Sequence, residues 1–450
     1  MSEIEKSGSP NNAQEFARWI VAKLNAAGHQ ALLAGGCVRD RLLGKNPKDY
    51  DVATSATPEV VREIFGYRRT IAVGAAFGVI TVVGDKVTGN VEVATFRCDG
   101  GYSDGRHPDR VTYSNAEHDA QRRDFTINGL FYDPLSDQVI DYVNGQTDLR
   151  ARVIRAIGRP GDRFHEDHLR MLRAVRFATV LNFEIEPETL IAIRTLAHEI
   201  RTVSGERIAA EMYRLLSSPY RGRGLSLLAD SGLWSQLLPQ WSAREPGTTS
   251  DFAAICARVS QLPLQSAPLE VTLAVIALRQ ALASESGPGP VAWDSVLPRV
   301  AARLTDVVRA WKLSNDSKAV FRAVQLHLGA IARAPELPWS QLQPVLVAPK
   351  IREVLDVAEG LTGEGTVSSD SGFISHECID LCRTHLERPL EELNPPPLLS
   401  GDELKARGLV EGPQLGRCLL ELRRKQLDGE LASSEAAWEW VKQQRASEPK

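Results

Sequence analysis

A short apolar run that stops at a glycine pair restricts the fold of this chain more than any other feature. The run Ala31–Leu33 predicts a buried strand, and the segment Gly35-Gly36 predicts the turn after it. We expect a short helix to follow, carrying Arg39 and Asp40. Glycines let backbone N–H groups approach a phosphate closely, and a helix N-terminus favours negative charge. This stretch therefore predicts a strand, turn and helix that can hold a phosphate.

Two aspartates follow in the segment Lys48-Asp-Tyr-Asp-Val-Ala-Thr54. Asp49 and Asp51 are two residues apart, so in a second strand both carboxylates would leave the same face. Alone, a glycine pair is usually a turn, and Asp-x-Asp is usually a solvated strand or loop. Together they indicate a pair of Mg²⁺ ions bound to a nucleoside triphosphate.

A third carboxylate, Glu92, interrupts the apolar run of a strand expected at Val91–Phe96. Taken alone, it is an outward-facing residue of an edge strand. In this run a third carboxylate could meet those of Asp49 and Asp51. A strand carboxylate at this point in the order resembles that of the nucleotidyltransferases, which implies a role in metal binding or in activating an attacking hydroxyl. Three acidic residues are thus candidates for catalysis.

Length and charge limit the function classes. A chain of 450 residues predicts two to four domains, and a formal charge of −4 means that any nucleic-acid surface must be local. Six scattered cysteines indicate a reducing cytoplasm. The polar segment 1–12 lacks the apolar core of a signal peptide, and no apolar stretch is long enough for a membrane span. We expect a soluble cytoplasmic protein.

The pattern G-G-x-V-R-D-x-L-L-G followed by D-x-D resembles the nucleotidyltransferase superfamily that includes polymerase β. More closely, it resembles the class II CCA-adding tRNA nucleotidyltransferases and their poly(A) polymerase relatives. The resemblance implies an α+β fold, with a polymerase-β-like head of mixed sheet and helices followed by an all-helical neck, body and tail. It also implies Mg²⁺ as cofactor, CTP and ATP as substrates, and tRNA as partner through its 3′ end and elbow. No membrane and no obligatory protein partner are expected.

The same resemblance, with breaks in composition, divides the chain. Linker-like stretches lie at 244–250, 284–290 and 360–372. The expected parts are a disordered N-terminus 1–12, a catalytic head 13–147, a neck 148–240 with the base-selection motif, a body 241–385 and a tRNA-binding tail 386–450.

A polar segment between Arg97 and Arg122, rich in glycine, aspartate and arginine, predicts a mobile loop around 99–108. It is either a tolerated insertion or, by the resemblance, the flexible loop that CCA-adding enzymes need for the final A. The nearby pair His118-Asp119 is typical of metal-dependent phosphohydrolases only with further histidines, so we assign it no metal.

The string R-R-D-F-T-I-N-G at 122–129 could be an ordinary charged turn before a strand. Paired arginines suit phosphate oxygens, and Asp or Asn can bind a ribose 2′-hydroxyl. The string resembles the family's ribose and triphosphate motif, which implies that Arg123, Asp124 and Asn128 bind the nucleotide beside Gly35, Gly36 and Arg39.

Eight arginines against three acids between 150 and 176 indicate a phosphate-binding surface or a solvated helix face, and we count Arg173 and Arg176 among the nucleotide-binding candidates. Asp167 and Arg170 are three residues apart, so we expect them as neighbours on one helix face. They are either a helical salt bridge or a base selector, because Arg donors and an Asp acceptor match the edges of C and A and mismatch U and G. The string E-D-x-x-R resembles the family's base-selecting motif.

Three further segments complete the reading. Val203–Glu211 predicts a helix and resembles a supporting family motif, and the pattern G-D-x-L…G-L…G-P-x-L-G after residue 400 resembles the tail that contacts the tRNA elbow. The last segment holds His376, Cys378, Cys382 and His385. Of these, Cys378, Cys382 and His385 would share a helix face, and we expect buried thiols in preference to a zinc site.

Alternatives remain within and outside the family. Poly(A) polymerases tend to carry a basic motif after a Val-Gly that corresponds to Val73-Gly74, and this chain lacks it. Addition of CC only or of A only is a further alternative, which the loop argues against. A non-catalytic RNA-binding protein would not need the carboxylates.

Overall fold

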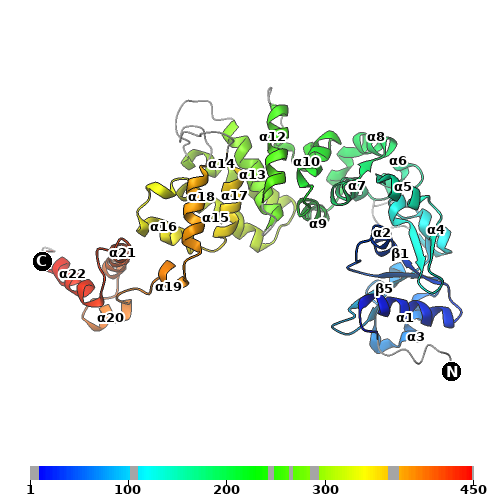
Figure 1. Cartoon of the computed structure of the whole chain (residues 1–450), viewed down its shortest axis with the longest axis horizontal. Coiled ribbons are helices and arrows are strands. Elements are labelled where there is room, and N and C mark those ends of the chain that lie inside the picture. Colours follow the sequence, from blue (N-terminus) through cyan, green and yellow to red (C-terminus); the bar gives the residue numbers. More distant parts are fainter. Residues whose placement is uncertain are drawn as a thin grey trace. The chain divides into compact units, whose positions relative to one another are not determined.

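The computed structural model describes residues 10–101, 110–241, 248–262, 267–283, 293–362 and 374–447. The chain forms two compact units, Met1–Ser242 and Ala243–Lys450. The first unit contains the large sheet and the helices through α11, and the second is helical (Figure 1). The predicted α+β fold with a helical remainder is confirmed.

A seven-stranded mixed sheet organises the head, in the order β3-β4-β5-β2-β1-β8-β9. Its central pair, β2 and β5, is parallel, whereas β1 pairs antiparallel with β2 and β8. The strands are β1 Ala31–Ala34, β2 Asp51–Thr54, β3 Thr70–Ile71, β4 Val79–Val83, β5 Asn90–Thr95, β8 Leu130–Asp133 and β9 Gln138–Asp141.

One face of the sheet is covered by α1 (Ala13–Ala26) and α3 (Pro58–Phe65), which contact the central strands (Figure 1). Residues that are buried on β4 and β5 alternate with residues that face the other side, as the two-residue period of a strand requires. Asn12 accepts a hydrogen bond from the Glu15 N–H at 2.9 Å and starts α1, so this part of the predicted disordered segment is ordered. Residues 1–9 lie outside the described residues.

The polar segment after Arg97 is more regular than predicted. Its ends form an antiparallel ladder of β6 (Arg97–Gly100) and β7 (Arg110–Tyr113), and α4 (Ala116–Gln121) follows. Residues 102–109, most of the predicted loop, lie outside the described residues. The 3₁₀ helix η4 (Thr126–Asn128) then leads into β8.

The rest of the first unit is helical, apart from a short parallel ladder of β10 (Val153–Ile154) with β11 (Glu184–Ile185). This ladder and an isolated antiparallel bridge from Ala156 to Phe125 are additions to the helices expected in the neck. The helices are α5 Gly145–Ala151, α6 Pro160–Glu166, α7 Leu169–Leu181, α8 Pro187–Leu196, α9 Gly205–Leu216, α10 Arg221–Asp230 and α11 Leu233–Leu237.

The second unit consists of helices that pack around apolar cores. Helix α13 is buried along most of its length. The predicted linkers at 284–290 and most of 244–250 and 360–372 lie outside the described residues. The helices are α12 Thr248–Gln261, α13 Pro268–Ala283, α14 Trp293–Ala310, α15 Asn315–Ile331, α16 Trp339–Leu346, α17 Ile351–Gly360, α18 His376–Leu386, α19 Leu390–Leu393, α20 Gly401–Ala406, α21 Pro413–Leu427 and α22 Ser434–Ser447.

Cys378, Cys382 and His385 of α18 contribute to packing, whereas His376 is exposed. Cys378 and Cys382 are buried, and the Cys378 thiol donates to the Ala332 carbonyl at 3.3 Å. His385 stacks on Trp339 with ring centroids 4.5 Å apart. Burial raises the pKa of Cys382 to about 12, which disfavours the thiolate that zinc needs. Within the described ranges no group of three His, Cys, Asp or Glu side chains is arranged to hold a metal.

No helix in the described part of the chain combines the length and the apolar character that crossing a membrane requires.

We predict that the tight packing of Gly145 on η4 makes Gly145→Ala destabilising. A Cβ at this position would lie 2.2 Å from the Thr126 carbonyl oxygen and 2.9 Å from a methyl of Leu130. Such overpacking typically costs about 1–3 kcal/mol. Calorimetry should show a lower Tm for the head transition of this variant.

The matched control is Gly161→Ala on α6, where an added Cβ meets no atom within 4 Å. Alanine is favoured over glycine in helices, so this variant should keep or slightly raise the Tm. Equal Tm values for the two variants would contradict the packing described for Gly145.

Candidate active site

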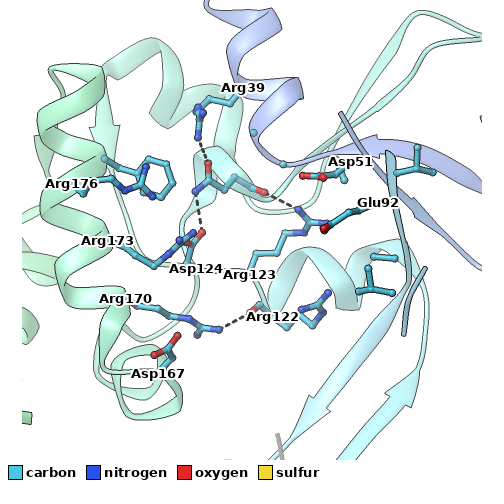
Figure 2. A pocket seen from close by; sticks show the side chains of 18 residues that line it. Arg39, Asp51, Glu92, Arg122, Arg123, Asp124, Asp167, Arg170, Arg173 and Arg176 are labelled. Atoms are coloured by element: carbon cyan, nitrogen blue, oxygen red, sulfur yellow. Dashed lines mark hydrogen bonds and ion pairs between the residues drawn. The ribbon is translucent and has the colours of Figure 1, made fainter. Parts of the chain in front are cut away.

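A cavity of about 590 Å³ opens in the first unit between the sheet, the turn after β1 and helix α7. Its side chains come from segments far apart in the sequence (Figure 2). Six arginines and four acidic residues line it, so its formal charge is positive. The lining residues are Ala34, Gly35, Gly36, Arg39, Asp51, Val52, Val79, Glu92, Ala94, Arg122, Arg123, Asp124, Asn128, Asp167, Arg170, Arg173, Arg176 and Phe177.

The carboxylates of Asp51 and Glu92 share one wall. In the parallel pair of β2 and β5, Asp51 stands directly opposite Glu92, so both side chains leave the same face of the sheet. Burial of the carboxyl and the charge of Glu92 raise the pKa of Asp51 to about 6; Arg123 lowers it and Asp49 raises it further. Carboxylates that repel one another in this way are stabilised by a bound cation.

Asp49 is placed differently from the prediction. The strand begins at Asp51, and Asp49 lies exposed in the bend before it. It is not among the residues that line the cavity, although its charge contributes to the raised pKa of Asp51. The prediction that both aspartates lie in one strand is wrong, because Lys48 and Asp49 complete the turn that brings the chain into the sheet.

Gly35 is required by both its backbone and its surroundings. It has a φ of +72°, and a Cβ there would lie 2.9 Å from Nη1 of Arg123. Its N–H donates to the Leu130 carbonyl at 3.0 Å, which fixes the turn to β8. Gly36 begins α2 (Gly36–Leu42), and this helix brings Arg39 to the cavity.

Asp124 connects three of the predicted site residues. Its Oδ2 accepts hydrogen bonds from Nε and Nη2 of Arg173 at 2.9 and 2.7 Å, and its Oδ1 accepts from Nδ2 of Asn128 at 3.0 Å. Asn128 Oδ1 in turn accepts from Nη1 of Arg39 at 2.7 Å. Burial alone would raise the pKa of Asp124, but Arg173 and the Asn128 amide hold it at about 2.

Phe177 is a cavity residue that the sequence did not reveal. The Arg176 guanidinium lies 3.5 Å from the centre of its ring, and those of Arg39 and Arg173 lie at 5.3 and 5.4 Å. In the sequence, only its position directly after Arg176 pointed to a place in the cavity. The contact with Arg39 could not be foreseen, because Arg39 comes from a distant segment. The other lining residues that were missed are Ala34, Val52, Val79, Ala94 and Arg122.

Helix α9 supports the arginines of α7 from behind. The buried Glu211 accepts from Nε of Arg176 at 2.6 Å and pairs with Arg173 at 3.5 Å. Burial lowers the pKa of Arg176 to about 10, although Glu211 raises it. Much of the Arg176 charge is thus offset by Glu211 within the protein.

Asp167 and Arg170 both line the cavity but do not share a helix face. Asp167 ends α6 in an extended conformation, whereas Arg170 lies on the next helix, α7. Asp167 pairs with Arg207 at 2.7 Å, and Arg170 pairs with Glu166 at 2.5 Å and donates to the Arg122 carbonyl at 3.3 Å. The expected pairing is therefore wrong, since a helix boundary separates the two residues and each is held by its own partner. Figure 2 shows both side chains and the hydrogen bond from Arg170 to Arg122.

Comparison with known proteins agrees with this architecture. A model of the poly A polymerase head domain matches residues 31–155, and one of the probable RNA and SrmB-binding site of polymerase A matches residues 182–244. Over 424 residues the chain is 33% identical to the CCA-adding enzyme of Limosilactobacillus fermentum, a match that covers 93% of this chain and 94% of that enzyme. The chain belongs to the CCA-adding enzyme family.

Solved CCA-adding enzymes share the fold. The Bacillus stearothermophilus CCA-adding enzyme in complex with CTP is 30% identical, with a TM-score of 0.67 over 96% of this chain and 97% of that one. A Thermotoga maritima CCA-adding enzyme complexed with tRNA, 18% identical, has a TM-score of 0.63 over 98% of this chain and 97% of that one and supports the fold alone.

Other relatives match this chain along only about half of their own length. The CCA-adding enzyme of Levilactobacillus brevis is 44% identical over 221 residues, 49% of this chain and 54% of that enzyme. Poly(A) polymerase I of Escherichia coli O6:H1 is 42% identical over 246 residues, 51% of each chain.

We predict that the Asp124 ion pair makes stability dependent on acid pH. A carboxyl whose pKa is lowered from 3.8 to about 2 in the folded state stabilises the protein above about pH 4, and this contribution is lost as the pH falls toward 2. The shift corresponds to roughly 2 kcal/mol. The free energies of unfolding of wild type and Asp124→Asn should therefore converge between about pH 4 and 2. A difference that stays constant across this range would contradict the lowered pKa.

Proposed function

We propose that the protein adds the sequence CCA to the 3′ end of tRNA from CTP and ATP without a nucleic-acid template. In each step the 3′-hydroxyl of the RNA attacks the α-phosphate of the nucleotide, and pyrophosphate leaves. One observation carries the proposal: a single cavity joins the carboxylates of Asp51 and Glu92 to the side chains of Asp167 and Arg170. Similarity to CCA-adding enzymes along nearly the whole chain supports it.

The cavity arginines and the glycine turn would bind the triphosphate. Gly35 and Gly36 leave room for phosphate oxygens, and Arg39 and Arg123 supply donors on either side of this turn. Asp124 and Asn128 would fix the ribose. Because these side chains already hold one another, the nucleotide would meet donors and acceptors in place and lose little free energy in ordering them.

We propose Mg²⁺ as the metal, held by Asp49 and Asp51 with Glu92 beside them. Two carboxylates plus substrate phosphates are the usual ligands of this ion. Burial and the charge of Glu92 raise the pKa of Asp51, and a cation beside the two carboxylates would relieve that repulsion. When bound, Mg²⁺ lowers the pKa of the attacking hydroxyl and offsets charge on the leaving oxygens. Glu92 would either join the metal site or accept the hydroxyl proton.

Asp167 and Arg170 would select the base. Cytosine and adenine both offer ring acceptors and an exocyclic amine donor, which suit an arginine and an aspartate respectively. Uracil and guanine would leave buried polar groups unpaired. Arg207 and Glu166 hold the two side chains separately, so each keeps its orientation without depending on the other.

The remaining parts of the chain complete the proposal. We assign 13–147 to catalysis, 148–240 to base selection, 241–385 to a connecting body and 386–450 to contact with the tRNA elbow. In the tail, Arg407 and Lys442 lie over the Trp438 ring at 5.0 and 5.9 Å, which gives it a basic and aromatic surface suited to RNA. Since tRNA is its substrate, we place the protein in the cytoplasm.

The test is incorporation of labelled CTP and ATP, separately and together, into tRNA that ends at the discriminator base, at C or at CC. We expect ordered addition of C, C and A that then stops. Unlimited addition of A would indicate a poly(A) polymerase, and addition of C alone a CC-adding enzyme. No transfer by the folded protein would favour an RNA-binding role.

Asp51→Asn serves as the catalytic control in this assay. It removes a carboxylate that the active site needs and relieves its repulsion from Glu92, so the Tm should not fall. Turnover should drop by about two orders of magnitude or more, as for loss of one transition-state contact. Substantial remaining turnover in Mg²⁺ would contradict the proposed metal site. Asp49→Asn, measured in parallel, tests whether the exposed aspartate is also needed.

We predict that Asp167→Asn weakens base selection. The amide can donate as well as accept, so it tolerates the carbonyl oxygens of U and G that the carboxylate repels. The ratio of kcat/KM for CTP over UTP on one tRNA should fall by about tenfold or more. The control is Asp162→Asn, an exposed residue of α6 that does not line the cavity. An unchanged ratio for Asp167→Asn would mean that Asp167 only binds Arg207.

A further inference from the structure

Asp119 is a buried carboxylate behind the cavity, and the proposed reaction does not use it directly. The residue is 1% exposed and lies on α4. Its Oδ1 accepts from Nε and Nη2 of Arg122 at 2.9 and 2.7 Å, and its Oδ2 accepts from Nε and Nη2 of Arg123 at 3.2 and 3.0 Å. The one carboxylate therefore binds the Nε and Nη2 atoms of each of two consecutive arginines.

This arrangement fixes where the Arg123 guanidinium points. With Nε and Nη2 bound to Asp119, Nη1 donates to the Asn128 carbonyl at 3.3 Å and lies 2.9 Å from the position of a Cβ on Gly35. The guanidinium also lies 5.0 Å from the centre of the Phe131 ring. Arg123 is thus directed to the glycine turn and the carboxylate wall (Figure 2).

Arg122 is held in the same way and supports a second part of the cavity. Its backbone carbonyl accepts from Nη2 of Arg170 at 3.3 Å. The two arginines carry like charges side by side, and a shared carboxylate offsets their repulsion. Burial alone would raise the pKa of Asp119, but Arg123 and Arg122 lower it by more, so the pKa lies below its usual value. The carboxylate therefore stays charged at neutral pH.

Asp119 also reaches the segment that precedes the predicted loop. Its Oδ1 lies 3.4 Å from the backbone N–H of Arg97, the first residue of β6. One side chain thus connects the start of the β6–β7 ladder to the two cavity arginines.

We propose that Asp119 is a positioning residue that orients Arg122 and Arg123 for the triphosphate of the incoming nucleotide. The inference rests on the proposed function, since it assumes that these arginines meet a nucleoside triphosphate. Asp119 does not touch the nucleotide and acts through the guanidinium groups. Its loss should therefore weaken nucleotide binding more than tRNA binding.

The experiment compares wild type and Asp119→Asn for transfer of CMP to tRNA in Mg²⁺. The KM for CTP should rise by about tenfold, the size expected for a charge-assisted hydrogen bond, with the KM for tRNA little changed. The variant is repeated in Arg123→Ala and Arg122→Ala backgrounds. If Asp119 acts through the arginines, its substitution should add much less than tenfold there.

The matched control is Glu186→Gln. Glu186 is 8% exposed and paired with Arg155 at 3.2 Å, but does not line the cavity, so both KM values should stay near wild type. An unchanged KM for CTP in Asp119→Asn, or an equal rise in every background, would overturn the proposal in favour of a structural ion pair. If Asp119→Asn does not fold, Asp119→Glu, which keeps the charge but displaces both guanidinium groups, takes its place under the same criteria.

Calorimetric titration of each protein with Mg·CTP separates this inference from the proposed function. Wild type that binds CTP but transfers no CMP would contradict the proposed function alone. The Kd for CTP would then replace the KM, and a tenfold weaker Kd in Asp119→Asn would still support the positioning role. Equal Kd values would overturn it.

Discussion

The cavity of the first unit depends on the ion pair between Asp124 and Arg173. Asp124 follows helix α4 and Arg173 lies on α7, so the pair joins two segments 49 residues apart. Its carboxylate is largely buried, and the cost of removing water from it is offset because two guanidinium N–H groups, the Asn128 amide and the Phe125 N–H all donate to it. Through Asn128 the same network reaches Arg39, which fixes the helix after the glycine turn.

Charge is distributed unevenly around this network. On the side of α7 and η4, nearly every acidic group is matched with arginines, and Glu211 and Asp119 extend the matching behind the cavity wall. On the sheet, Asp51 and Glu92 face one another without an equal counter-charge. A preorganised set of donors beside unbalanced carboxylates suits a metal-bound triphosphate, which supplies both negative oxygens and a cation.

Local periodicity and turn chemistry were enough for most elements. The predicted strands at 31–33 and 91–96 are observed as β1 (Ala31–Ala34) and β5 (Asn90–Thr95), because these patterns act within one segment. Two details failed at element boundaries: Asp49 lies in a bend before its strand, and Asp167 lies between two helices. Spacing alone cannot locate a boundary, since the same residues satisfy either conformation until the neighbouring segments pack.

The sequence by itself determined the candidates: the glycine turn, the carboxylates and all cavity arginines but Arg122 follow from residue type and spacing, and the family from their order along the chain. Only the tertiary structure decided which groups pair. Sequence spacing suggested that Asp167 pairs with Arg170, whereas in the structure Asp167 pairs with Arg207 of α9. Asp119 pairs with both Arg122 and Arg123. The physical reason is that a hydrogen bond depends on distance in space, and the partners of a buried charge come from whichever segments the core brings beside it.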